Sequence, residues 1–159
     1  MTEPTFPSRL WKRMTTAQRL RAAQALWANE EAAADQKQAV QLIAKQFKLR
    51  PKTANGLDVE RKARYLAGVP EVPEEMAAHL LIVYHLADQR PLMGAFLDAL
   101  GIAHDNGMID GDAPAPDPSK LTGAVDAIKS RFPAEDVALY LDTLLLQDPG
   151  TWGGLQEVR

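Results

Sequence analysis

Cysteine is absent from all 159 residues of the chain. Its absence excludes disulfide bonds, zinc sites built from thiolates and cysteine nucleophiles. It is compatible with a reducing compartment, so we expect a cytoplasmic location. The first 14 residues lack the continuous apolar stretch of a secretory signal. No uncharged apolar run reaches the roughly 20 residues that a membrane-spanning helix needs, so we predict no membrane association.

The sequence also lacks the short motifs of common enzyme classes. It contains no phosphate loop, no GxGxxG, no GxSxG and no HExxH. No segment alternates apolar and polar residues with a period of two, so no β-sheet is expected. Aromatic residues make up only 6% of the chain. An all-α protein without a clear catalytic signature is therefore predicted.

The most continuous apolar stretch is residues 76–100, MAAHLLIVYHLADQRPLMGAFLDAL. Pro73 suits the first position of a helix, and a helix that is apolar on nearly all sides is buried. The residue before a proline avoids the α region, so Arg90 should end this helix and Pro91 should start a second one. Gly101 suits the C-terminal cap of that second helix. We predict a central buried helix pair.

The other segments have shorter apolar stripes at helical spacing, and Thr15 with Gln18 forms a capping-box pattern. The helix that Thr15 opens should turn Trp27 toward the core, and Asn29 should cap a second helix whose buried face includes Val40. They predict a compact bundle of six to eight helices in a single all-α domain, residues 1–159. Its expected parts are a loose N-terminal arm (1–14), a basic helical half (15–68) and an acidic helical half (69–159) with a long loop (101–117). A weak echo at an offset of 58 residues is consistent with two similar helical hairpin units, arising by duplication or independently.

Charge is distributed unevenly along the chain. Up to Gly68 there are thirteen basic and six acidic residues, a net +7, and the whole-chain value of -3 leaves -10 for the remainder. Such a division is typical of a basic half that binds a partner. It is equally consistent with two halves that attract each other, or with solvated faces that differ in composition.

One set of residues suggests metal chemistry. His85, then His104-Asp105-Asn106-Gly107, then a distant aspartate (Asp136 or Asp142) resembles the HD-type metal-dependent phosphohydrolases. The resemblance implies that His85, His104 and Asp105 bind a divalent metal, which activates a water for attack on phosphate. The alternative is structural: His85 lies at the edge of the core and residues 104–107 form an Asx-type turn.

A second set suggests nucleic-acid binding. Residues 41–53, QLIAKQFKLRPKT, loosely resemble a helix-turn-helix, with Lys48 where the usual turn glycine would stand. Seven basic side chains in this part of the chain could neutralise phosphates: Lys45, Lys48, Arg50, Lys52, Arg61, Lys62 and Arg64.

The leading hypothesis is a non-enzymatic interaction module without a cofactor, which binds another protein or a second copy of itself. The metal would be needed only by the phosphohydrolase alternative. We expect Asp88, Arg90 and Asp98, beside the central break, to line a groove. Further candidate contacts are Met and aromatic residues near the two ends of the chain: Trp11, Met14 and Trp152.

Overall fold

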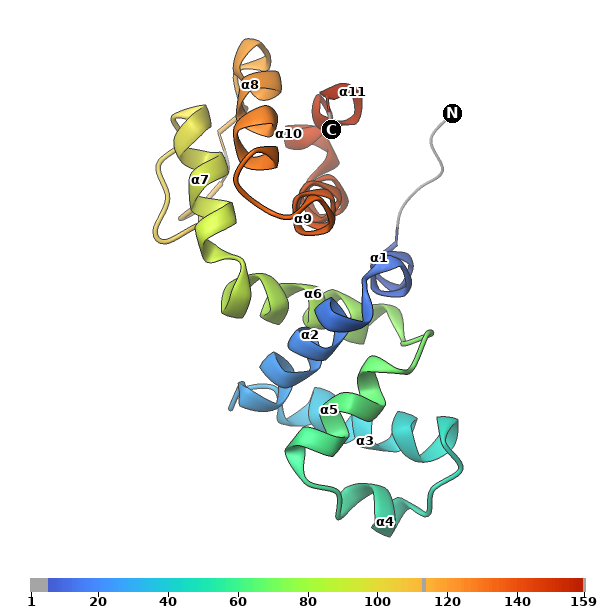
Figure 1. The fold of residues 1–159 in the computed structure, drawn as a ribbon. Coiled ribbons are helices and arrows are strands. Elements are labelled where there is room, and N and C mark those ends of the chain that lie inside the picture. Colours follow the sequence, from blue (N-terminus) through green and yellow to red (C-terminus); the bar gives the residue numbers. More distant parts are fainter. Residues whose placement is uncertain (1–5, 113, 159) are drawn as a thin grey trace. The chain divides into compact units, whose positions relative to one another are not determined.

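A computed structural model describes residues 6–112 and 114–158. These residues form eleven helices and no strand, apart from an isolated bridge between Asp105 and Met108 (Figure 1). The all-α prediction is confirmed. The helices outnumber the six to eight expected because four are short: α1 (Pro7–Arg13), α4 (Pro51–Asn55), α10 (Pro149–Trp152) and α11 (Leu155–Val158). None of the described helices is long and apolar enough to cross a membrane.

The helices belong to two compact units, which meet in the sequence between Asp88 and Gln89. The first unit contains α1 and α4 together with four longer helices: α2 (Thr16–Ala28), α3 (Ala33–Gln46), α5 (Val59–Ala67) and α6 (Glu74–Asp88). The second contains α10 and α11 with α7 (Arg90–Leu100), α8 (Pro118–Lys129) and α9 (Ala134–Gln147). The two helices of the predicted central pair, α6 and α7, therefore each contribute to the core of a different unit.

In the first unit, α2 packs against α5 and α6, and α3 packs against α4 and α5. The predicted capping box starts α2: the Thr15 hydroxyl accepts from the Gln18 backbone N–H, and the Gln18 side chain accepts from the Thr15 N–H. The buried residues Ala22 and Ala23 are small, so neighbouring helices can approach α2 closely. This frame holds α3, α4 and α5 in place.

Residues 7–13 are a helix, so the prediction of a loose arm over 1–14 is wrong for this part, while residues 1–5 lie outside the described residues. Pro7 stands at the start of α1, which packs against α6. Trp11 is 0% exposed, and its indole N–H donates to the Val69 carbonyl over 2.8 Å. Burial of this large side chain explains why the segment is ordered.

The start of α3 also differs from expectation. Asn29, expected as its N-cap, instead accepts from the Glu31 N–H, and α3 begins only at Ala33. The connection is held by Gln36, whose side-chain amide donates to the carbonyls of Leu26 and Asn29, each over 2.9 Å. An asparagine side chain can close a turn as readily as it can cap a helix.

In the second unit, α7 packs against α8, and its buried residues include Leu92, Phe96 and Leu97. Phe96 makes ring contacts with Tyr140 and Trp152, at centroid distances of 5.7 and 5.9 Å. Gly101 ends α7 with a left-handed φ of 71°, as predicted for this cap. Residues 101–117 then lead to α8.

Candidate functional site

A surface groove of about 1070 Å³ lies on the first unit, between α2, α3, α4 and the start of α5. We call it the lysine-rimmed groove. Its lining is Trp27, Ala33, Gln36, Lys37, Val40, Gln41, Ala44, Lys45, Leu49, Pro51, Lys52, Asn55, Val59 and Lys62. Many of these residues are exposed, so the hollow opens to solvent along its length.

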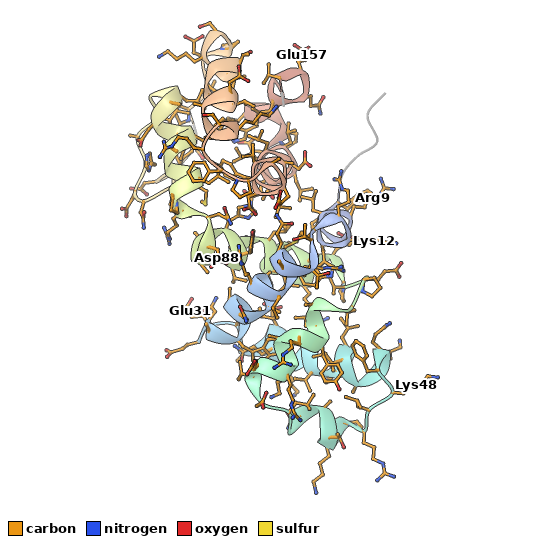
Figure 2. All side chains as sticks on the ribbon, viewed as in Figure 1. Arg9, Lys12, Glu31, Lys48, Asp88 and Glu157 are labelled. Carbon is orange, nitrogen blue, oxygen red and sulfur yellow. The ribbon has the colours of Figure 1, made fainter. Side chains whose placement is uncertain are left out.

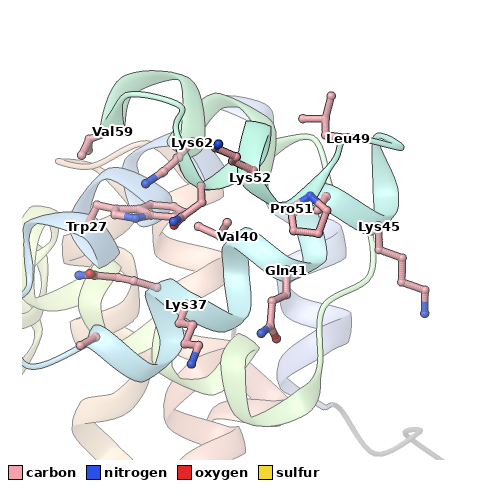
Figure 3. A pocket seen from close by; sticks show the side chains of 14 residues that line it. Trp27, Lys37, Val40, Gln41, Lys45, Leu49, Pro51, Lys52, Val59 and Lys62 are labelled. Atoms are coloured by element: carbon pink, nitrogen blue, oxygen red, sulfur yellow. The ribbon is translucent and has the colours of Figure 1, made fainter.

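The centre of the groove is apolar and its edges are cationic. Figure 3 shows Trp27 beside Val40, with Lys52 and Lys62 on one side of them and Lys37 on the other. Trp27 is half-buried, so part of the indole is accessible from the groove. Tryptophan at the centre of an apolar depression is the kind of residue that contributes most to binding energy.

Four lysines line the groove, and among the described lining residues there is no aspartate or glutamate. Three acids that lie near the lining residues in the sequence have other partners. Asp35 pairs with His79 at 2.8 Å, Asp58 caps α5 through the Arg61 N–H at 2.8 Å, and Glu60 pairs with Arg64 at 2.7 Å. Positive charge therefore gathers around an apolar surface, and no acid among the described lining residues offsets it.

The sequence of α3 explains one wall of the groove. Lys37, Gln41 and Lys45 are spaced by four, so they lie on one face of the helix. Val40 and Ala44 lie beside them, between that face and the buried residue Ile43. One side of α3 thus packs in the core while the neighbouring side faces the groove.

The end of α3 shapes the adjoining wall. The Leu49 N–H donates to the Ala44 carbonyl at 2.9 Å, and Lys48 takes a left-handed φ of 55°. This is a Schellman motif, which reverses the chain direction immediately after the helix. Leu49 and Pro51 consequently line the groove, and Lys48 lies at the turn outside it (Figure 2).

The seven basic residues predicted to bind nucleic acid fall into two groups. Lys45, Lys52 and Lys62 line the groove, whereas Lys48, Arg50, Arg61 and Arg64 do not. Arg61 and Arg64 are engaged with Asp58 and Glu60, and they line a smaller hollow of about 410 Å³ with Phe47, Tyr65 and Gly68.

The three predicted metal ligands are divided between the two units: His85 lies in the first, and the neighbours His104 and Asp105 lie in the second. His85 is buried in the first unit, where its Nδ1 bonds to the Leu81 carbonyl at 2.8 Å. His104 belongs to the second unit; its Nε2 bonds to Asp98 at 2.7 Å and its Nδ1 accepts from the Gly107 N–H at 2.9 Å. Among the described residues, no group of three or more histidine, aspartate or glutamate side chains is arranged to hold a metal ion.

A turn does form here, as the structural alternative proposed, but it spans residues 105–108. The backbone groups of Asp105 and Met108 bond to each other in both directions, at 2.7 and 3.0 Å. Asn106 and Gly107 have φ values of 49° and 90°, as a type I′ turn requires. The turn is closed by the backbone rather than by the Asp105 carboxylate, and both His104 ring nitrogens serve to hold it.

Of the residues predicted to line a groove beside the central break, two fix this same turn to α7. Arg90 donates to the Asn106 carbonyl at 3.0 Å, and Asp98 accepts from His104. Asp88 is the last residue of α6, in the other unit. These interactions explain Arg90 and Asp98 as residues that hold the loop.

The predicted contacts near the chain ends are wrong. Trp11, Met14 and Trp152 are 0%, 4% and 3% exposed, so they stabilise the core and cannot offer a surface to a partner. The residues of the groove that the sequence reasoning missed are Trp27 and Val40, both expected to point into the core, and Lys37. The spacing of Lys37, Gln41 and Lys45 was the available signal.

The chain matches no protein-family model, no curated protein and no solved structure. What it does is therefore inferred from its own residues.

Proposed function

We propose that this protein is a non-enzymatic binding module that docks a segment of another protein in the lysine-rimmed groove. The observation that carries the proposal is the combination, in one hollow, of an accessible tryptophan, aliphatic side chains and a charged edge. Protein interfaces share this anatomy, with an apolar centre that excludes water and a polar rim.

The size and openness of the groove support a polypeptide ligand. Pockets for small molecules measure roughly 300–1000 Å³ and enclose most of the ligand. This groove, at about 1070 Å³, is at the upper limit of that range and has exposed residues along both edges. It can accept several side chains of a peptide, but it would leave much of a small metabolite in solvent.

The chemistry of the lining supports binding without catalysis. Among the described residues that line the groove there is no carboxylate, imidazole or hydroxyl group. Lysine is the single titratable side chain among these residues, whereas general acid–base catalysis commonly relies on a histidine or a carboxylate. The proposal includes a cytoplasmic location, which rests on the absence of cysteine.

The test is a selection from an unbiased library of displayed peptides against the full-length protein. Peptides that dock in the groove should bind the wild type and bind the Val59→Glu variant about tenfold less tightly. Val59 is 53% exposed at the groove edge, so this change places a charge in the site with little effect on folding. Val40→Glu, nearer the centre, should cause a larger loss.

The matched control is Met108→Glu, which also adds a carboxylate at an exposed apolar residue but lies outside the groove. It should leave peptide binding unchanged. Enriched peptides that bind all three variants as tightly as the wild type would show that the groove is not the docking site. A library from which nothing is enriched would also contradict the proposal.

A further inference from the structure

We infer that the segment bound in the lysine-rimmed groove is an acidic amphipathic helix. The inference rests on the proposed function and names the chemistry of its partner. Two features of the groove carry it: an excess of lysine at the edge, and an apolar centre bounded by helices.

The edge selects for negative charge. Within the described part of the chain, Lys37, Lys45, Lys52 and Lys62 form no ion pair. Three acids close to them in the sequence, Asp35, Asp58 and Glu60, are held by His79, Arg61 and Arg64. An acidic ligand would therefore gain new pairs without breaking existing ones. A basic ligand would be repelled by four cations across a surface of low polarity.

The centre selects for a helix over an extended peptide. Extended peptides bind chiefly by adding to the edge of a sheet, which supplies partners for their backbone groups. The described residues contain no strand and hence no such edge. A helix satisfies its backbone hydrogen bonds internally and needs from the groove only apolar contacts, which Trp27, Val40, Ala44 and Leu49 offer.

The same features make nucleic acid the weaker candidate. Single strands bind through successive aromatic platforms, and Trp27 is the one aromatic residue among the described lining residues. Val40, Leu49 and Val59 offer nothing to phosphate or to base edges. Arginine, the preferred residue for two-pronged phosphate contacts, does not occur in the lining, and Arg64 already pairs with Glu60.

Three synthetic peptides of about 18 residues, roughly five helical turns, test the inference. The first has leucines spaced at i, i+3, i+4 and i+7, so that they lie on one face of a helix, and glutamate at the remaining positions. The second keeps the leucines and replaces glutamate with lysine. The third has the composition of the first in an order that breaks the helical repeat. Binding to the full-length protein is measured by calorimetry, and by Trp27 fluorescence with Trp27→Phe as the blank.

Two double variants separate groove charge from total charge. Lys45→Gln with Lys52→Gln removes two cations from the groove. Lys48→Gln with Arg50→Gln removes two cations from the same eight-residue stretch but outside the groove. Only the first should weaken binding of the acidic peptide, by about tenfold, since two solvent-exposed ion pairs at the edge of the groove are lost.

Tight binding of the acidic peptide alone, with this pattern of variants, supports the inference. Equal binding of the acidic and lysine peptides, or of the acidic and reordered peptides, overturns it. So does a single-stranded oligonucleotide that displaces the acidic peptide. Failure of all three peptides, while library peptides still lose affinity on Val59→Glu, overturns the acidic helix and leaves the docking function in place.

Discussion

The indole N–H of Trp11 donates to the backbone carbonyl of Val69 across 58 positions of sequence. It joins the first described helix to the segment that follows α5, and both residues are 0% exposed. Because the bond is buried, the carbonyl has no access to solvent if the donor is removed. This contact ties the N-terminal segment into the first unit.

Trp11→Phe should lower the free energy of unfolding by about 2–4 kcal/mol, because it leaves a buried carbonyl unsatisfied and a small cavity beside a smaller ring. Urea titration followed by circular dichroism measures the change. Trp27→Phe, the same substitution at a half-buried site in the groove, should cost less than about 1 kcal/mol. Equal losses in the two variants would show that the Trp11 bond contributes nothing specific.

Lys48→Gly should stabilise the first unit. Lys48 has a left-handed φ of 55° at the end of α3, a conformation in which a side chain is strained and glycine is not. Relative to Lys48→Ala, which keeps the Cβ and removes the charge, the glycine variant should be more stable by about 1 kcal/mol. Thermal unfolding of the two variants compares them directly, and a less stable glycine variant would refute the strained conformation.

The local parts of the fold could be predicted because their signals lie within a few residues of each other. The Thr15–Gln18 capping box and the Gly101 cap each depend on neighbouring backbone groups. The break before Pro91 was also predicted, although it falls at Gln89, one residue earlier than expected, and Arg90 already belongs to α7. The start of α3 could not, because Asn29 has two local options and the choice is made by Gln36, seven residues further on.

The groove could not be predicted, because helical periodicity identifies an apolar face but not the helix that covers it. Trp27 and Val40 lie on the apolar sides of α2 and α3, and both were assigned to the core. The arrangement of α4 and α5 leaves them half-covered instead. Three of the four lysines in the groove were predicted from the sequence to form a basic cluster. The apolar surface between them depends on long-range packing and was not predicted.

The Asp117 cap of α8 should make stability depend on pH. Its carboxylate accepts from the Ser119 hydroxyl at 2.8 Å and from the Ser119 N–H at 3.0 Å, and these bonds lower the pKa of Asp117 from its usual 3.8. A lowered pKa in the folded state means that the stabilisation is complete above 3.8 and is lost as pH falls below that value.

Asp117→Asn should therefore be less stable than the wild type near neutral pH, and the difference should shrink at acid pH, as the Asp117 carboxyl group takes up its proton. Urea unfolding at both pH values measures it. Asp126→Asn removes a carboxylate from the same helix away from the cap and serves as the control for net charge. A difference between wild type and Asp117→Asn that persists in acid would contradict the assignment.

Gly107 allows the turn of residues 105–108 to lie against α7. A Cβ at this position would stand 2.8 Å from the Met93 Cβ and 3.2 Å from the Arg90 carbonyl, and φ is 90°. Gly107→Ala should therefore destabilise the second unit by about 2–4 kcal/mol, because it combines backbone strain with a steric clash, and it should increase proteolysis of the loop.

Gly111→Ala separates the backbone strain from the clash. Its φ is 80° in the same loop, but nothing lies within 4 Å of an added Cβ, so only the strain of about 1 kcal/mol remains. If both alanine variants lose the same stability, the turn is not in close contact with α7, and the bonds from Arg90 and Asp98 would need another explanation.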